Sequence, residues 1–208
     1  MKDVLRAPQL MKIIYAKPRI SLNAPQWANA FMRVASRTII PCFLDDSVPV
    51  GSMGSGGATS MFYGAKVERL ILIFDNFNNS INDSIIISSL TYMLYNCYNL
   101  RSVKRLCLSS TINSQTLTNA FSKCYSLEEI ELYRLGKDVS FVNSSVLNLA
   151  SIVYMVEKAI NTTAITITLH ADALARCTAD TTEYEYNSNT YTGIVALATA
   201  KNITLASA

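Results

Sequence analysis

An internal repeat constrains the fold of this chain more strongly than any other feature of its sequence. Residues 90–103 read LTYMLYNCYNLRSV and residues 117–130 read LTNAFSKCYSLEEI, with five identical positions at an offset of 27. A fainter copy starts at Met61, and strand-like segments recur at residues 165–169 and 202–205. A unit of this size cannot bury its apolar side alone, so successive units must stack on one another.

The segments that precede these strands are helical or turn-like in pattern, and they lie at residues 84–96, 116–123, 146–160 and 191–201. The alternation predicts an α/β repeat fold: a short leucine-rich-repeat solenoid with a parallel sheet and helices on the other side. The cue Leu127-x-x-Ile130-x-Leu132 is the strand signature of leucine-rich repeats, in which these apolar residues point into the core.

Residues between the apolar positions are expected to face solvent on the sheet. In the later repeat these candidate partner-binding residues are Glu129, Glu131 and Tyr133, and one repeat earlier they are Lys104 and Arg105. The earlier strand, VKRLCL, has one residue more than its counterpart, which predicts a β-bulge. The resulting face carries charges of both signs.

Charge and composition divide the chain into three parts. The first 40 residues carry a net charge of +6 and the remaining 168 carry −3, an asymmetry typical of a segment that meets an acidic partner. Residues 46–58 are rich in Gly and Ser and read as a linker. We therefore expect an α+β anchoring and oligomerisation segment at residues 1–45, and a repeat domain with a C-terminal closing repeat at residues 59–208.

The anchoring segment is expected to contain a helix and an edge strand. Pro25 and the apolar spacing after it predict a helix to about Arg37, and residues 12–16 are expected to pair as a strand. The candidate anchoring residues are Lys12, Ile14, Lys17, Arg19, Trp27, Phe31, Arg33 and Arg37. Prolines and apolar stretches interrupt the basic residues, which disfavours nucleic acid as the partner.

Composition excludes several classes of protein. No unbroken hydrophobic run exceeds five residues, which excludes a membrane-spanning helix and gives no membrane insertion. Lysines and prolines interrupt the apolar residues of the first 20 positions, so no signal peptide is expected. Five cysteines without a Cys-x-x-Cys pair read as reduced thiols in a protein made in a cytoplasm.

Motifs that could carry catalysis are weak, and the chain is not expected to be an enzyme or to hold a metal or cofactor. The single histidine, His170, follows a strand and is expected to be a turn or capping residue. Cys97 and Cys124 occupy equivalent repeat positions and are expected to be buried core thiols. The Gly-rich residues 51–59 lack the lysine of a phosphate-binding loop.

Tyrosine is the residue type that most favours a binding surface, because it offers a large contact area and one polar tip. Residues 183–191 read as an exposed loop in the closing repeat, which makes Tyr184, Tyr186 and Tyr191 candidate contact residues. Tyr98 and Tyr125 stand at equivalent repeat positions and are expected to be partly in the core.

Two stretches, AFSKCYSLEEIEL and MLYNCYNLRSV, resemble the BspA-like leucine-rich repeat proteins, whose repeats place a small residue and Cys before Leu-x-x-Ile. The tail NLASIVYMVEKAINTTAITITLHADALARCT, followed by AKNITLASA, is similar to the closing segment of repeat proteins of gut Bacteroidales bacteria and their phages. The resemblance covers residues 59–208 and implies a binding or structural protein without catalytic residues.

The resemblance and the missing export signal together predict a phage virion component, such as a capsid decoration, head or tail-fibre protein. It would be made in the host cytoplasm and would bind other virion proteins or copies of itself, and through its repeat surface a host-surface protein or glycan. The alternative is a BspA-like protein-binding module on the bacterial cell surface or inside the cell.

Overall fold

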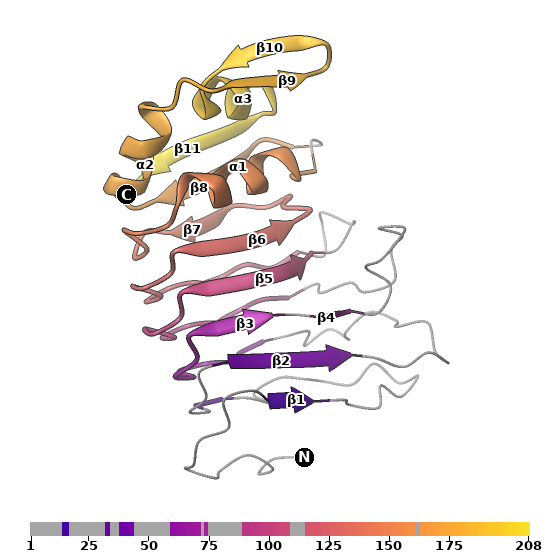
Figure 1. Cartoon of the computed structure of the whole chain (residues 1–208), viewed down its shortest axis with the longest axis vertical. Coiled ribbons are helices and arrows are strands. Elements are labelled where there is room, and N and C mark those ends of the chain that lie inside the picture. The colour runs from indigo at the N-terminus through magenta and orange to yellow at the C-terminus, as the bar shows by residue number, and fades with distance from the viewer. Residues whose placement is uncertain are drawn as a thin grey trace.

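A computed structural model describes residues 14–16, 32–33, 38–43, 59–71, 73–74, 89–108, 115–160 and 163–208. It confirms the α/β class with parallel sheets. Strands stack in a column, with β1 near one end and three helices with a β-hairpin at the other (Figure 1).

The largest sheet is parallel, and its main path follows chain order. Its strands are β1 (Ile14–Ala16), β2 (Thr38–Phe43), β3 (Arg69–Ile71), β5 (Ser102–Cys107) and β6 (Glu129–Tyr133), with β4 (Ile73–Phe74) paired to β2 beside β3. The register pairs Val103 with Ile130 and then Leu106 with Leu132. Two residues on β5 therefore face one on β6, which confirms the predicted bulge.

The sheet continues across the boundary expected between anchor and repeat domain. Thr38 pairs with Arg69 and Ile39 with Leu70, so residues 31–40, FMRVASRTII, align with residues 62–71, FYGAKVERLI. β1 pairs in parallel with β2, which confirms the expected edge strand over Ile14–Ala16. The linker predicted at residues 46–58 lies outside the described residues.

The turns before the strands are joined by their own hydrogen bonds, which we call the turn ladder. Arg33 N donates to Tyr63 O at 2.9 Å, Gly64 N to Tyr95 O at 2.8 Å, and Asn96 N to Ser122 O at 3.0 Å. The three donor residues have φ of 58°, 63° and 62°, the left-handed conformation that turns the chain through a corner. Lys123 N, with φ of 62°, continues the ladder to Asn143 Oδ1 at 2.9 Å.

These turns correct one expectation about helices and decide a second. Met32 and Arg33, the described residues of the helix predicted from Pro25 to Arg37, form a turn. Residues 89–96 and 116–123, expected to be helical or turn-like, are turns, because their amide groups bond to the neighbouring turn or to a carbonyl three residues back, as Leu94 N does to Ala120 O and Ala120 N to Leu117 O. Within the described residues, helices opposite the strands occur only after β7.

The C-terminal part contains the helices and two smaller sheets. A parallel sheet has the order β11 (Ile203–Ser207), β8 (Ile165–Leu169), β7 (Val139–Phe141), and β9 (Glu183–Tyr186) pairs with β10 (Asn189–Thr192) as an antiparallel hairpin. The helices are α1 (Leu149–Glu157), α2 (Ala171–Thr178) and α3 (Ile194–Ala200). Helices α1 and α3 fall inside the ranges expected from the sequence.

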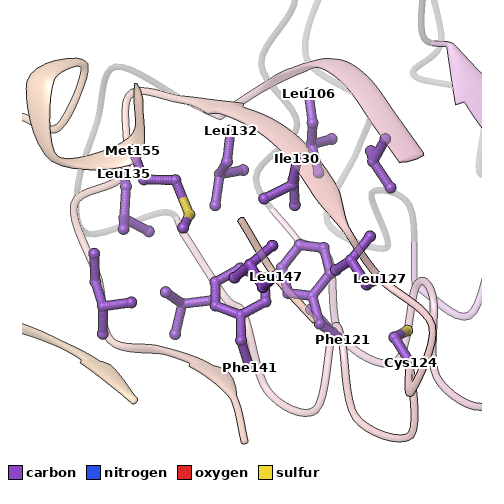
Figure 2. Packing of buried hydrophobic residues seen from close by; sticks show 14 of the residues in the cluster. Leu106, Phe121, Cys124, Leu127, Ile130, Leu132, Leu135, Phe141, Leu147 and Met155 are labelled. Atoms are coloured by element: carbon purple, nitrogen blue, oxygen red, sulfur yellow. The ribbon is translucent and has the colours of Figure 1, made fainter. Parts of the chain in front are cut away.

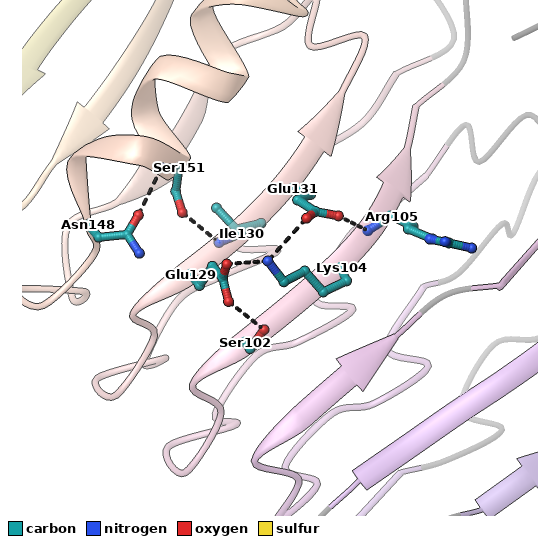
Figure 3. Close-up of polar contacts among 8 residues, drawn as sticks. All are labelled: Ser102, Lys104, Arg105, Glu129, Ile130, Glu131, Asn148 and Ser151. Atoms are coloured by element: carbon teal, nitrogen blue, oxygen red, sulfur yellow. Dashed lines mark hydrogen bonds and ion pairs between the residues drawn. The ribbon is translucent and has the colours of Figure 1, made fainter. Parts of the chain in front are cut away.

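Helix α1 covers the edge of β6, where the largest sheet ends (Figure 3). Ser151 Oγ accepts a hydrogen bond from Ile130 N at 2.9 Å, and Glu128 O accepts one from Asn148 N at 2.9 Å. At the other end of the strand, Arg134 N donates to Lys158 O at 3.0 Å. The helix thus takes the hydrogen bonds that a further strand would otherwise make.

A single hydrophobic core runs through both parts of the chain (Figure 2). Leu127, Ile130 and Leu132 are fully buried, as the repeat pattern predicts. The rings of Phe121 and Phe141 stack with centroids 4.7 Å apart, and so join the last turn before β6 to β7. The packing therefore continues from the largest sheet into the C-terminal part.

We expect Ser151→Ala to lower the free energy of unfolding by about 1–3 kcal/mol, because it leaves the buried amide of Ile130 without its acceptor. Chemical denaturation measures the effect. Ser140→Ala, the same change at an exposed position of β7, is the control and should stay within about 0.5 kcal/mol of the parent protein. Equal stability of the two variants would contradict the role given to α1.

Candidate partner-binding surfaces

The exposed face of β5 and β6 carries an ion-pair network centred on Lys104 (Figure 3). Lys104 Nζ pairs with Glu129 and lies 3.0 Å from Glu131 Oε1. Glu129 also accepts from Ser102 Oγ at 3.2 Å, and Glu131 accepts from Arg105 N at 3.1 Å. The residues that the sequence places on the outer face are therefore there, and they bond mainly to one another.

The network shifts the ionisation of its members. The hydrogen bond from Lys104 lowers the pKa of Glu129, against a smaller effect of desolvation. Desolvation would lower the pKa of Lys104, but hydrogen bonds to Glu129 and Glu131 outweigh it and raise that pKa. Lys104 and Glu129 are thus both charged at neutral pH. Beyond the network, the guanidinium of Arg134 lies 5.6 Å from the ring centroid of Tyr133.

The tyrosines of residues 183–191 differ from the expectation of an exposed loop. The segment is the β9–β10 hairpin, and Tyr184, Tyr186 and Tyr191 are half-buried against the core. Alternation along β9 explains this, since Glu183 and Glu185 face solvent while the two tyrosines between and after them face inward. These three tyrosines hold the hairpin in place more than they offer a free surface.

Asp180 fastens the hairpin to α3. Its carboxylate accepts from Tyr184 Oη at 2.9 Å, from Ile194 N at 2.8 Å and from Thr182 N at 3.1 Å. Desolvation would raise its pKa, but these hydrogen bonds outweigh that effect and lower it. Gly193 has φ of 81°, and a Cβ there would lie 2.5 Å from Asp180 O, so the close approach requires glycine.

The described thiols are core groups, as expected for Cys97 and Cys124. Cys97 Sγ donates to Phe62 O at 3.0 Å, and Cys124 Sγ donates to Leu94 O at 3.1 Å, the equivalent carbonyl one turn later. Burial raises the pKa of Cys97 to about 12, that of Cys177 to about 11 and that of Cys124 well above its usual value. None of the three is a thiolate at neutral pH.

His170 is the N-cap of α2, which confirms the expected capping role. Its Nδ1 accepts from Asp172 N at 3.2 Å. Among the described residues, no three His, Cys, Asp or Glu side chains gather in a way that could hold a metal ion. In the same part of the chain, no helix has the length and hydropathy required to cross a membrane.

Tyrosines on the turns form a surface that the sequence interpretation missed. Tyr98 and Tyr125, expected partly in the core, are 40% and 53% exposed, because each follows a buried cysteine and points outward. Tyr63 and Tyr95 stack with centroids 5.0 Å apart, and Lys123 Nζ lies 5.2 Å from the centroid of Tyr95. The repeated Cys-Tyr pair was the available signal, since only one residue of such a pair can face the core.

Two of the eight candidate anchoring residues, Ile14 and Arg33, are among the described residues. Lys12, Lys17, Arg19, Trp27, Phe31 and Arg37 lie outside the described residues. Ile14 begins β1, and Arg33 is an exposed corner of the turn ladder. The anchoring role of this set stays a prediction.

Comparison with protein-family models, curated proteins and solved structures finds no match, so the fold and surface described above are the evidence for function.

We expect Cys97, Cys124 and Cys177 to resist alkylation in the folded protein at pH 8, because burial keeps their thiols protonated. Mass spectrometry of peptides after iodoacetamide treatment measures this, with guanidinium-unfolded protein as the control in which all three react. Rapid native labelling of Cys97 or Cys124 would contradict the core assignment.

We expect Glu129→Gln to lower the free energy of unfolding at pH 7 by about 0.5 kcal/mol, a value that allows for solvent screening of a half-exposed pair. The pKa of Glu129 is lowered in the folded state. The difference in the free energy of unfolding between variant and parent is therefore fully present at pH values above the ordinary glutamate pKa of about 4.3, and it disappears as the pH falls through the lowered pKa.

Denaturation at a series of pH values measures this dependence. Glu183→Gln, the same change at an exposed residue of β9, is the matched control. A difference between Glu129→Gln and the parent that persists below the folded-state pKa would contradict the ion-pair explanation.

Proposed function

We propose that this chain is a non-enzymatic binding and structural protein built on a leucine-rich-repeat solenoid. The turn ladder carries the proposal. Equivalent corners at Arg33, Gly64, Asn96 and Lys123 stack in register, and they are followed by β2, β3, β5 and β6 in turn. Stacked repeats of this kind present extended rigid surfaces, and such surfaces suit recognition of a partner.

The solenoid includes part of the segment first interpreted as an anchor. Strands β1 and β2 extend the sheet, and residues 31–40 align with the following repeat. Anchoring by the basic N-terminal part then takes place at one end of the stack, while the closing repeat with its three helices occupies the other. A stack with two different ends can attach to one partner by its N-terminal end and bind a second partner along its sides.

A virion component is the setting that we favour, and its support is the resemblance of residues 59–208 to repeat proteins of gut Bacteroidales and their phages. The thiols of Cys97, Cys124 and Cys177 form no disulfide, which fits synthesis in a host cytoplasm. Candidate contact residues on the sheet are Lys104, Arg105, Glu129, Glu131 and Tyr133. Other virion proteins or further copies of this chain are the partners that this setting requires.

Isolation of the native complex tests the proposal. Affinity capture of the tagged protein from its source, followed by native mass analysis, should recover it in a fixed ratio with capsid or tail proteins. Recovery as a free 22.9 kDa species would overturn the virion setting and leave the bacterial binding module. A point variant of Arg33→Glu, which leaves the turn ladder's backbone bond in place, should weaken capture if the basic end is the attachment point.

A further inference from the structure

Five tyrosines and a lysine lie on the turns that precede β3, β5 and β6, and we call this set the turn-edge cluster: Tyr63, Tyr92, Tyr95, Tyr98, Tyr125 and Lys123. The ring of Tyr95 stacks on that of Tyr63 and meets the edge of Tyr92 at 5.5 Å. Lys123 Nζ lies over the ring of Tyr95, 5.2 Å from its centroid.

The cluster presents aromatic rings to solvent. Tyr92, Tyr98 and Tyr125 are 37%, 40% and 53% exposed, a concentration of large side chains that a surface with no partner seldom shows. Tyr98 and Tyr125 occupy equivalent positions of adjacent turns, so their backbones stand about 4.8 Å apart along the stack. The cluster therefore follows the stack axis, as a binding site for an extended polymer would.

The turns of this edge carry basic side chains. Over the described turns, residues 59–67, 89–100, 115–127 and 142–147, the charged side chains are Lys66 and Lys123. The residues that directly follow these turns add Glu68 and the ion pair of Arg101 with Glu128 at 3.5 Å. The turns themselves contrast with the strand face, where Glu129 and Glu131 neutralise Lys104. A ligand of the turn edge is therefore expected to be anionic.

A hollow continues the cluster at Tyr125. It has a volume of about 430 Å³, and besides Tyr125 its polar lining comes from Asn143, Ser145 and His170. Amide, hydroxyl and imidazole groups beside an exposed ring supply the hydrogen bonds and the apolar contact that a sugar residue requires. The hollow has room for one or two such residues at the end of the row.

We propose that the turn-edge cluster binds an acidic polysaccharide, with the exposed rings of Tyr98 and Tyr125 against the sugar faces and Lys123 on a sugar carboxylate. Nucleic acid fits less well. Two lysines on the described turns of this edge make few of the phosphate contacts on which such binding depends. The inference rests on the proposed binding role and specifies its ligand.

Titration of the full chain with short oligosaccharides tests the inference. The probes are octasaccharides of galacturonate, hyaluronate and polysialate, with methyl-esterified oligogalacturonate as the uncharged match and an oligo(dT) of similar length as the nucleic-acid match. At least one acidic octasaccharide should bind more tightly than the esterified one. Lys123→Gln should weaken that binding about tenfold, the loss expected for one charge-assisted hydrogen bond.

Matched variants separate the site from general effects. Lys158→Gln removes the same charge at an exposed residue beside the opposite end of β6, and it should leave binding unchanged. Tyr125→Ala should weaken binding at least fivefold, while Tyr125→Phe, which keeps the ring, should retain most of it. Unchanged circular dichroism and melting temperature establish that each variant is folded.

Four results would overturn the inference: no binding of any acidic octasaccharide, equal binding of the esterified probe, binding of oligo(dT) alone, or an unchanged affinity in Lys123→Gln. These outcomes are distinct from those of the native-complex experiment. A protein recovered with virion partners that binds no acidic sugar refutes the ligand and keeps the proposed function. One that binds the sugar but is recovered alone keeps the ligand and loses the virion setting.

Discussion

The hydrogen bonds between successive corners of the turn ladder are the interaction on which the rest of the structure depends. A left-handed conformation costs about 1–2 kcal/mol at a residue other than glycine, and Arg33, Asn96 and Lys123 all adopt it. Each corner gains a hydrogen bond to the next turn, and it also directs the chain into a strand that pairs in parallel with its neighbour. The local cost is therefore offset by two ladders of backbone bonds and by the core between them.

Backbone hydrogen bonding also explains why a helix, and not a further strand, lies beside β6. A stack of parallel strands ends in an edge with unpaired amide and carbonyl groups, which is open to association. Asn148, Ser151 and Lys158 of α1 and its flanks bond to the backbone of that edge. Because α1 takes the place of a further paired strand, β7 pairs with β8 in a new sheet while Phe141 keeps the core continuous.

Much of this arrangement could be predicted from the sequence, and the failures have specific physical causes. Repeat length and apolar spacing predict the inward side chains of Leu127, Ile130 and Leu132. They also predict the bulge in β5 and the burial of the two cysteines at equivalent positions. Apolar spacing does not distinguish a helix from a run of turns, so residues 84–96 and 116–123 were expected only to be helical or turn-like. The relation of the segment before residue 41 to the later units was missed because it is visible only through the register that pairs Thr38 with Arg69 and Ile39 with Leu70.

The surfaces were the least predictable feature, because exposure depends on which neighbours a side chain finds. Charged residues on the strand face were placed correctly, yet they neutralise one another across adjacent strands. On the turn edge, short turns bring tyrosines from three repeats together beside a lysine with no carboxylate among them. Repetition explains both outcomes, since residues at equivalent positions become spatial neighbours. Opposite charges at such positions pair with one another, whereas like aromatic residues gather into an exposed surface.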